Sequence, residues 1–165
     1  MLNGFCRSGY PLSLNSSTEK VEQYIQTRAE YLLSENSKVI FVCDNHRPDD
    51  PEINNPYPPH CIQGTTEAEI IDSLRPLAKN AIILPKHTLS IFYQTGLDAL
   101  LSSLNPSVVE IVGVCTDICD LFAVYELRIR GYQVFVSRKG VLPYDPKKQN
   151  EFLDYFKDKL GANVD

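Results

Sequence analysis

Two cysteines lie four residues apart where an apolar run gives way to a polar pair. The stretch reads IVGVCTDICDLFAV over residues 111–124, with Cys115 before the Thr-Asp pair and Cys119 after it. A thiol in the first turn of a helix lies among unpaired backbone N–H groups at the positive end of the helix dipole, and both favour the thiolate. Cys119 is therefore a candidate nucleophile. Two simpler interpretations stay open: both thiols are buried hydrophobes, and Asp117 is a helix cap.

A disulfide is an unfavourable interpretation of this spacing. The chain has five cysteines, an odd number without a Cys-x-x-Cys pair. If a strand ends at Cys115 and a helix begins near Cys119, a tight turn joins them, whereas a disulfide needs Cα atoms within about 7 Å and Cβ atoms that face each other. A thiol redox sensor that uses this pair stays as an alternative function.

A second group of residues has the composition of a metal site. Asp44 and His46 form an Asp-x-His pair, which points both side chains to the same side of an extended segment. With His60 and a further carboxylate from Glu52 or Asp50, the set offers the mixed nitrogen and oxygen ligands of a catalytic zinc, manganese or iron ion. The alternative is a solvated acidic loop. The prolines of NPYPPH favour a site, because they fix the backbone just before His60.

One lysine completes the set of chemically capable residues. Lys86 follows Pro85 at the end of an apolar run. Its ammonium group would lower the pKa of the Cys119 thiol if the fold brought the two together. An exposed lysine with no special role is an equally ordinary interpretation.

Alternating strands and helices are expected to position these residues. Short β-branched runs indicate strands at residues 38–43, 80–84, 107–114 and 132–137. Helical patterns with candidate caps or terminal glycines lie at residues 17–35, 65–77, 94–104, 116–131 and 146–161. This alternation predicts an α/β fold with a parallel sheet and helices on both faces. Polar residues follow three of the strands, so we expect them at the carboxyl edge of the sheet, where chemistry gathers in such folds.

Composition limits the other classes of function. With 165 residues, 43% of them hydrophobic, the chain reads as a single domain over residues 1–165. No apolar run approaches the roughly 20 residues needed to cross a bilayer, and no secretory signal pattern opens the chain, so we expect a cytoplasmic protein without a membrane partner. A net charge of −5 without a basic stripe disfavours nucleic acid. Small molecules are the expected ligands.

Three motifs together resemble the isochorismatase-like cysteine hydrolases, and among them most closely the nicotinamidases. The motifs are PYPPHCIQGTTEAEI, LPKHTLSIFYQTGL and IVGVCTDICDLFAVYELRIRGYQVFV, in the order of the family. The resemblance covers residues 1 to about 160 and implies a three-layer α-β-α fold with a mainly parallel, doubly wound sheet. It also implies a small amide as substrate, and a homo-oligomer is one expectation because the family is often oligomeric.

The resemblance assigns catalytic roles to three residues. Cys119 stands at the position of the nucleophile, which would attack an amide carbonyl and form a thioester. Lys86 stands at the position of the active-site lysine. The backbone N–H groups of Cys115 and Cys119 would form the oxyanion hole, next to a cis peptide bond that the family commonly has between the positions of Val114 and Cys115.

The resemblance also assigns metal and substrate contacts. Asp44, His46 and His60 match the metal ligands of the nicotinamidases, and Glu52 falls near a fourth ligand position. These would hold a divalent ion such as zinc, manganese or iron. Two aromatic residues, Phe5 and Tyr57, fall where the family stacks rings on its substrate.

The first residues depart from the family pattern. Family members begin with a hydrophobic strand that ends in Asp-x-x-Asn-x-Phe, and this chain opens MLNGFC, so that only Asn3 and Phe5 match. The general-base aspartate would precede Met1, and the first central strand would be missing with it. We therefore expect a native beginning upstream of Met1. Two alternatives to a nicotinamidase-like enzyme stay open: another small amide or ureide hydrolase of the superfamily, and an inactive metal-binding homologue.

Overall fold

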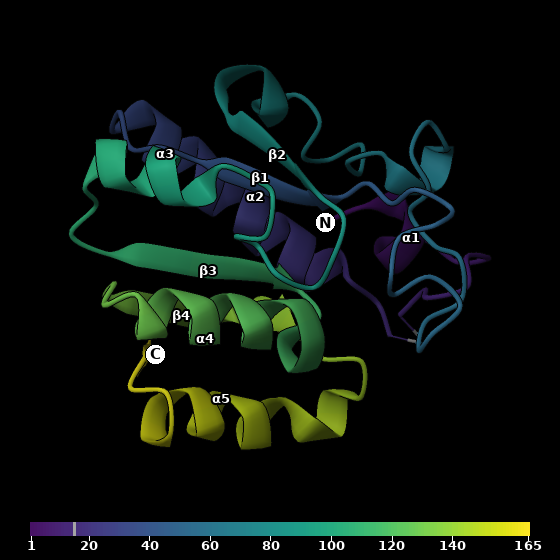
Figure 1. Cartoon of the computed structure of the whole chain (residues 1–165). Coiled ribbons are helices and arrows are strands. Elements are labelled where there is room, and N and C mark those ends of the chain that lie inside the picture. Colours follow the sequence, from purple (N-terminus) through teal and green to yellow (C-terminus); the bar gives the residue numbers. More distant parts are fainter. Residues whose placement is uncertain (15) are drawn as a thin grey trace. The chain divides into compact units, whose positions relative to one another are not determined.

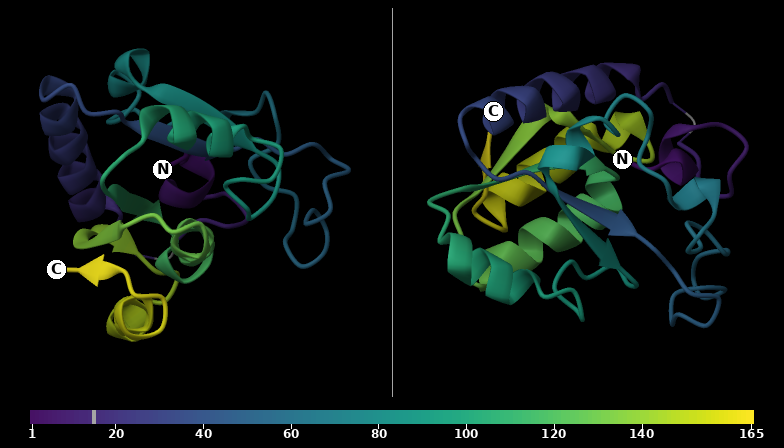
Figure 2. Two further views of the ribbon diagram at one scale, coloured as in Figure 1. Left: turned by 60° about the vertical axis from the view of Figure 1, so that its left-hand side comes forward. Right: turned by 90° about the horizontal axis from the view of Figure 1, so that it is seen from above.

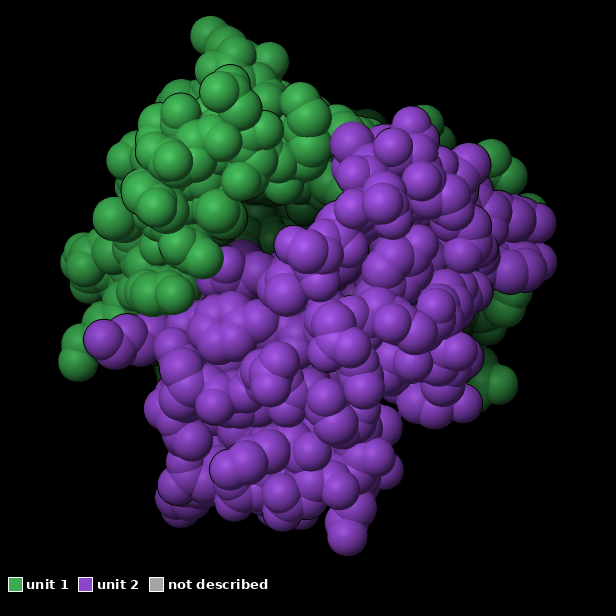
Figure 3. All heavy atoms as spheres, turned by 90° about the vertical axis from the view of Figure 1, so that its left-hand side faces the viewer, with its two compact units in different colours: residues 1–88 green, residues 89–165 purple. Residues whose placement is uncertain are grey.

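The computed structural model describes residues 1–14 and 16–165, and the chain divides into two compact units. Unit 1 comprises Met1–Thr88 and unit 2 comprises Leu89–Asp165 (Figure 3). Each unit contains a parallel sheet and its own helices. The prediction of a single domain over residues 1–165 stays a prediction.

Unit 1 is built around two parallel strands. Strand β1 (Ile40–Asp44) lies beside β2 (Ile82–Lys86) (Figure 1). Their parallel register places Asp44 opposite Lys86 at the carboxyl ends. The other elements of this unit are α1 (Asn3–Cys6), α2 (Glu19–Ser34) and the 3₁₀ turns η1 (Thr66–Ala68) and η2 (Leu77–Asn80). Both strands begin two residues later than the sequence pattern indicated, and they end one residue later in β1 and two residues later in β2.

Helix α2 buries one face and carries a charged anchor. Val21, Ile25 and Ala29 recur every four residues and are buried, which is the spacing of an apolar stripe on a helix. Beside this stripe, Glu22 accepts hydrogen bonds from Arg7 Nη1 (2.6 Å) and from Thr18 Oγ1 (2.5 Å). The helix is thereby tied to the chain that precedes it.

The predicted helix at residues 65–77 was wrong. Within it Thr66–Ala68 forms a 3₁₀ turn, bends and turns follow, and Leu77 begins the second 3₁₀ turn, η2. The backbone of this segment pairs with the start of the chain instead: Leu2 and Ile70 form an antiparallel bridge, and Asn3 N–H donates to Glu69 O (2.9 Å). Long-range pairing and the burial of apolar side chains here outweigh a local helical preference.

Unit 2 is a three-stranded parallel sheet with three helices. The strands lie in the order β3 (Val109–Val114), β4 (Val134–Leu142) and β5 (Asn163–Val164). The helices are α3 (Leu97–Leu104), α4 (Leu121–Ile129) and α5 (Gln149–Asp158), which follows the 3₁₀ turn η4 (Pro146–Lys148). Helices α4 and α5 lie side by side (Figures 1 and 2). The core of the unit includes the fully buried Val124, Leu127, Val136, Leu153 and Phe156.

The α/β class with parallel strands is confirmed. All four strands that the sequence pattern indicated are present, and every strand pairing in the described part of the chain is parallel. Strand β5 was not predicted because its two residues are too few to show a pattern. A search of the described residues for helices long and apolar enough to span a bilayer yields none.

Candidate active site and metal centre

A buried ion pair lies at the carboxyl ends of β1 and β2. Lys86 Nζ contacts Asp44 Oδ1, and the two residues are only 3% and 4% exposed. Burial by itself would raise the pKa of Asp44, but the Lys86 ammonium outweighs burial and holds that pKa below its ordinary value. The interpretation of Lys86 as an ordinary exposed lysine is therefore wrong.

Backbone pairing brings two distant histidines together. His46 N–H donates to Cys61 O (3.0 Å), and Gln63 N–H donates to His46 O (2.8 Å), so the chain around residue 61 runs parallel to the chain around residue 46. His60 consequently lies beside His46, with 4.6 Å between the ring centroids. The alternative of a solvated loop fails here, because both histidines are buried.

Asp44, His46 and His60 form a buried cluster that fits a metal ion. One ligand atom from each residue lies within 4.8 Å of those of the other two. His46 Nε2 is buried and makes no well-aligned hydrogen bond to the residues that the structure describes. Burial lowers the pKa of His46, which favours the neutral imidazole that a metal requires. A buried carboxylate and two imidazoles are a donor set that suits zinc, manganese or iron.

Glu52 lies next to this cluster. Its Oε1 atom is 3.2 Å from His46 Nε2, but Glu52 falls outside the set of three whose ligand atoms are mutually close. A short turn holds it there: Tyr57 N–H donates to Glu52 O (3.3 Å), and Asn54 N–H donates to Tyr57 O (2.6 Å). The role of Glu52 as a fourth ligand stays a prediction.

Aromatic rings surround His60. The ring of Tyr57 stands edge-on to the imidazole at 5.9 Å between centroids, and the ring of Phe5 lies at 6.1 Å. Both predicted substrate-binding residues are thus beside the cluster in unit 1. An aromatic substrate that reached the cluster would meet these rings.

Asp50, which the sequence offered as an alternative ligand, lies behind His46. Its Oδ2 atom is 3.3 Å from His46 Nδ1 and 3.2 Å from His87 Nδ1. The sequence pattern assigned no role to His87. Nothing in the local pattern links residues 50 and 87, which are 37 positions apart.

The two cysteines lie in unit 2, at the turn between β3 and α4. The Val114–Cys115 peptide bond is cis, as the resemblance implied. Residues Thr116–Asp120 form a π-helical turn (η3), in which Ile118 and Asp120 donate their N–H groups to Cys115 O at 3.0 and 3.1 Å. Cys115 is buried and Cys119 is partly exposed, and none of the five cysteines, all of which lie in the described residues, forms a disulfide. The chemical roles of Cys115 and Cys119, and the use of Cys119 with Lys86, stay predictions.

Polar side chains fix this turn from two directions. Asp117 Oδ1 accepts the N–H of Tyr144 (3.0 Å), so Asp117 ties the turn to the segment after β4 and is not the helix cap that the sequence allowed. Thr116 is fully buried, with its hydroxyl 3.5 Å from Gln149 Oε1 at the start of α5. The turn that carries Cys119 is thereby tied to the segment after β4 and to the start of α5.

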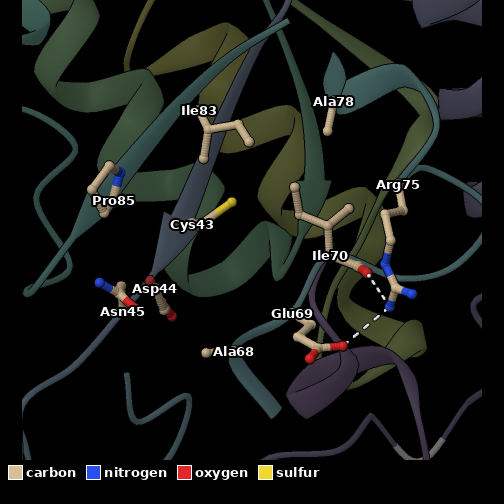
Figure 4. Close-up of a pocket in the computed structure, with 10 residues that line it drawn as sticks. All are labelled: Cys43, Asp44, Asn45, Ala68, Glu69, Ile70, Arg75, Ala78, Ile83 and Pro85. Atoms are coloured by element: carbon tan, nitrogen blue, oxygen red, sulfur yellow. Dashed lines mark hydrogen bonds and ion pairs between the residues drawn. The ribbon is translucent and has the colours of Figure 1, made fainter. Parts of the chain in front are cut away.

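Unit 1 also contains a cavity of about 400 Å³. Cys43, Ile83 and Pro85 line it from the strands, and Ile70 and Arg75 line it from the segment after η1, where Arg75 pairs with Glu69 at 3.2 Å (Figure 4). The cavity includes Asp44 in its lining but neither histidine of the cluster. We therefore do not assign the substrate to it.

The fold and the cysteine-bearing turn define an α/β protein with a strand-end site. The family model of the isochorismatase domain matches residues 1–164, and the chain therefore belongs to the isochorismatase family. The solved structure of the nicotinamidase PncA from Bacillus subtilis is similar over 99% of this chain and 93% of that one, at 27% identity and a TM-score of 0.92.

Two further relatives are at the level of 30% identity. The N-carbamoylsarcosine amidase of Thermoplasma acidophilum matches 99% of this chain and 90% of its own, at 30% identity and a TM-score of 0.87. Nicotinamidase 1 of Arabidopsis thaliana is 30% identical over 158 residues, which are 87% of this chain and 64% of that protein.

Proposed function

We propose that this protein hydrolyses a small amide, nicotinamide or a related pyridine carboxamide, to the acid and ammonia through a thioester on Cys119. The observation that carries the substrate class is the buried cluster of Asp44, His46 and His60 beside the rings of Phe5 and Tyr57. The similarity to nicotinamidases supports the same class.

Cys119 supplies the sulfur in this proposal. Its thiolate attacks the amide carbonyl carbon, and the resulting oxyanion is bound by the backbone N–H groups of Cys115 and Cys119. When the carbon–nitrogen bond breaks, the leaving nitrogen takes a proton and departs as ammonia. Water then hydrolyses the thioester, which releases the acid and restores the thiol.

Lys86 and Asp44 act through charge. The Lys86 ammonium stabilises the thiolate, and its ion pair with Asp44 supports the position of the ammonium group at the end of β2. The proton of the thiol passes to a general base, which then gives it to the leaving nitrogen.

A divalent ion would be held by Asp44, His46 and His60, with Glu52 beside them. When bound, such an ion would supply Lewis-acid chemistry toward a ring nitrogen of the substrate and so make its carbonyl more electrophilic. Phe5 and Tyr57 orient the ring by stacking.

The test measures ammonia release from nicotinamide by the purified protein. It uses the 165-residue chain and the chain with any residues that its gene encodes in frame before Met1. We expect Cys119→Ala to lose activity by roughly a thousandfold or more, as expected when a covalent nucleophile is removed. Cys6→Ser, which changes another partly exposed thiol, is the matched control and keeps the activity. Unchanged turnover in Cys119→Ala would exclude the proposal.

A second candidate function is the hydrolysis of a carbamoylated amine. The similarity to N-carbamoylsarcosine amidase favours it, because that structure has the same fold at 30% identity. The two candidates differ in their need for the ion: only a pyridine carboxamide offers a ring nitrogen to it. Faster turnover of carbamoylated amino acids than of nicotinamide, unaffected by a chelator, would support the second candidate.

A further inference from the structure

One carboxylate oxygen of Asp50 receives hydrogen bonds from three directions. Asp50 Oδ2 lies 3.3 Å from His46 Nδ1, 3.2 Å from His87 Nδ1 and 2.8 Å from the backbone N–H of Arg47, which donates to it. Only 11% of the Asp50 side chain is exposed. All these contacts lie within unit 1.

This contact determines which nitrogen of His46 can bind a metal. A neutral imidazole has one N–H group, and an ionised carboxylate can only accept. Two carboxylates lie near this ring: Asp50 is aligned for a hydrogen bond with Nδ1, whereas Glu52 Oε1 lies 3.2 Å from Nε2 without a well-aligned hydrogen bond. The proton is therefore placed on Nδ1, and the lone pair is left on Nε2, the buried atom that counts among the cluster's ligand atoms. Metal-bound histidines commonly have such a carboxylate partner on the other nitrogen.

His60 has the same arrangement with a different acceptor. Its Nδ1 lies 2.9 Å from the carbonyl oxygen of Pro58. Its other nitrogen, Nε2, lies 4.0 Å from Asp44 Oδ2. Both histidines of the cluster are thus held by Nδ1 and present Nε2. For His46 the acceptor is a charged carboxylate at 3.3 Å, and for His60 it is a neutral carbonyl at 2.9 Å.

His87 holds Asp50 from the other side. It follows Lys86, the last residue of β2, and its contact to Asp50 joins the loop after β1 to the chain after β2. The Asp44–Lys86 pair forms a parallel link between the two strand ends. Asp50 is consequently braced between a histidine of the cluster and a histidine outside it.

We propose that Asp50 is a positioning residue, which sets the tautomer and orientation of His46 for a divalent ion and is itself held in place by His87. This inference rests on the metal site of the proposed function. It replaces the interpretation of Asp50 as a ligand, because Asp50 contacts the outward nitrogen of His46 and lies outside the mutually close set.

The first experiment measures zinc affinity by competition with a chromophoric chelator. We expect Asp50→Ala to bind zinc about 10- to 100-fold more weakly than the wild-type protein, the usual effect of removing such an outer partner. Asp50→Asn keeps an acceptor oxygen, so its zinc affinity should fall less. The zinc affinity of His87→Ala should also fall less, because Asp50 is still present. Asp49→Asn, which changes the exposed neighbouring carboxylate, is the control and binds as the wild type does. Equal zinc affinity in Asp50→Ala and wild type would overturn the inference.

The second experiment reads the tautomer directly and does not need metal or activity. Nitrogen-15 NMR of the metal-free protein, at a pH where imidazoles are neutral, should show His46 protonated at Nδ1. Asp50→Ala should move that proton to Nε2, which the free imidazole of histidine prefers, while His60 stays unchanged as an internal check that the loop is folded. A proton on His46 Nε2 in the wild type would overturn the inference.

The two proposals can fail separately. If the wild-type protein binds no zinc but shows the Asp50-dependent tautomer of His46, then the metal part of the proposed function fails and the positioning contact stands without its ligand. If zinc binds and nicotinamide is hydrolysed with no effect of Asp50→Ala on zinc affinity or tautomer, then only the role of Asp50 fails.

Discussion

Asp120, the residue directly after Cys119, has an unusual environment for a carboxylate. It is 5% exposed, and its Oδ2 atom has no hydrogen-bond partner among the described residues. Its other oxygen lies against Gly113, where a Cβ atom would be 3.4 Å away, and Gly113 has a φ of +145° that other residues rarely adopt. Burial, aided by the charge of Asp117, raises the pKa of Asp120 from 3.8 to about 7.

This shift predicts a dependence of stability on pH. Between pH 3.8 and about 7, Asp120 is protonated in the folded protein and ionised in the unfolded chain. The free energy of unfolding therefore falls as pH rises through this window. A shift of about three pKa units corresponds to about 4 kcal/mol. Asp120→Asn removes the titrating group. The free energy of unfolding of this variant, measured by chemical denaturation at several pH values, should therefore fall less between pH 3.8 and about 7 than that of the wild-type protein.

The control for this prediction is Asp154→Asn on the exposed side of α5. Its free energy of unfolding should depend on pH as that of the wild-type protein does, across the whole pH range. If Asp120→Asn also follows the wild-type curve, then the buried carboxylate does not titrate in this window and the prediction is wrong.

At the scale of the element, α2 depends on Glu22 for its attachment. Glu22 accepts two hydrogen bonds from Arg7, one from Thr18 and one from Ser73 Oγ at 3.2 Å. Burial by itself would raise the pKa of Glu22, but the bonds from Arg7 and Thr18 outweigh it and lower the pKa below 4.5. The charged form therefore stabilises the fold.

We expect Glu22→Gln to lower the free energy of unfolding by about 2 kcal/mol near neutral pH, the range for hydrogen bonds to a charged group. Because the folded pKa is depressed, this contribution is present above pH 4.5 and is lost as pH falls through the folded pKa. The loss measured by denaturation should therefore shrink in acid. Glu19→Gln, in the same first turn but exposed, should change little; an equal loss in both variants would contradict the role of Glu22.

For the whole molecule, a bound ion should be linked to folding. The unfolded chain does not hold Asp44, His46 and His60 together, so zinc at 100 times its dissociation constant should stabilise the folded state by about 2.7 kcal/mol. In a protein of this size that corresponds to a rise in melting temperature of roughly 5 to 10 °C, which calorimetry would measure. His60→Ala should show a much smaller rise. The same rise in both proteins would place the binding elsewhere.

Local patterns in the sequence determined the strands and the residues that end them. Runs of β-branched residues bounded by turns predicted β1 to β4 to within a few residues at most boundaries, because buried parallel strands need such runs. Since parallel strands end at a common edge, the approach of Asp44 and Lys86 followed from their positions in the sequence. The turn that carries Cys119 was likewise visible as the end of an apolar run.

Only the tertiary structure decided how residues far apart in the chain combine. The segment at residues 65–77 carried a helical pattern but uses its backbone to pair with residues 1–3, a choice that local preference cannot reveal. His60 lies beside His46 because of the backbone hydrogen bonds around Cys61, and Asp50 Oδ2 contacts both His46 Nδ1 and His87, which follows β2. Such contacts depend on how distant segments are aligned with each other, and this alignment cannot be predicted from the sequence of either segment alone.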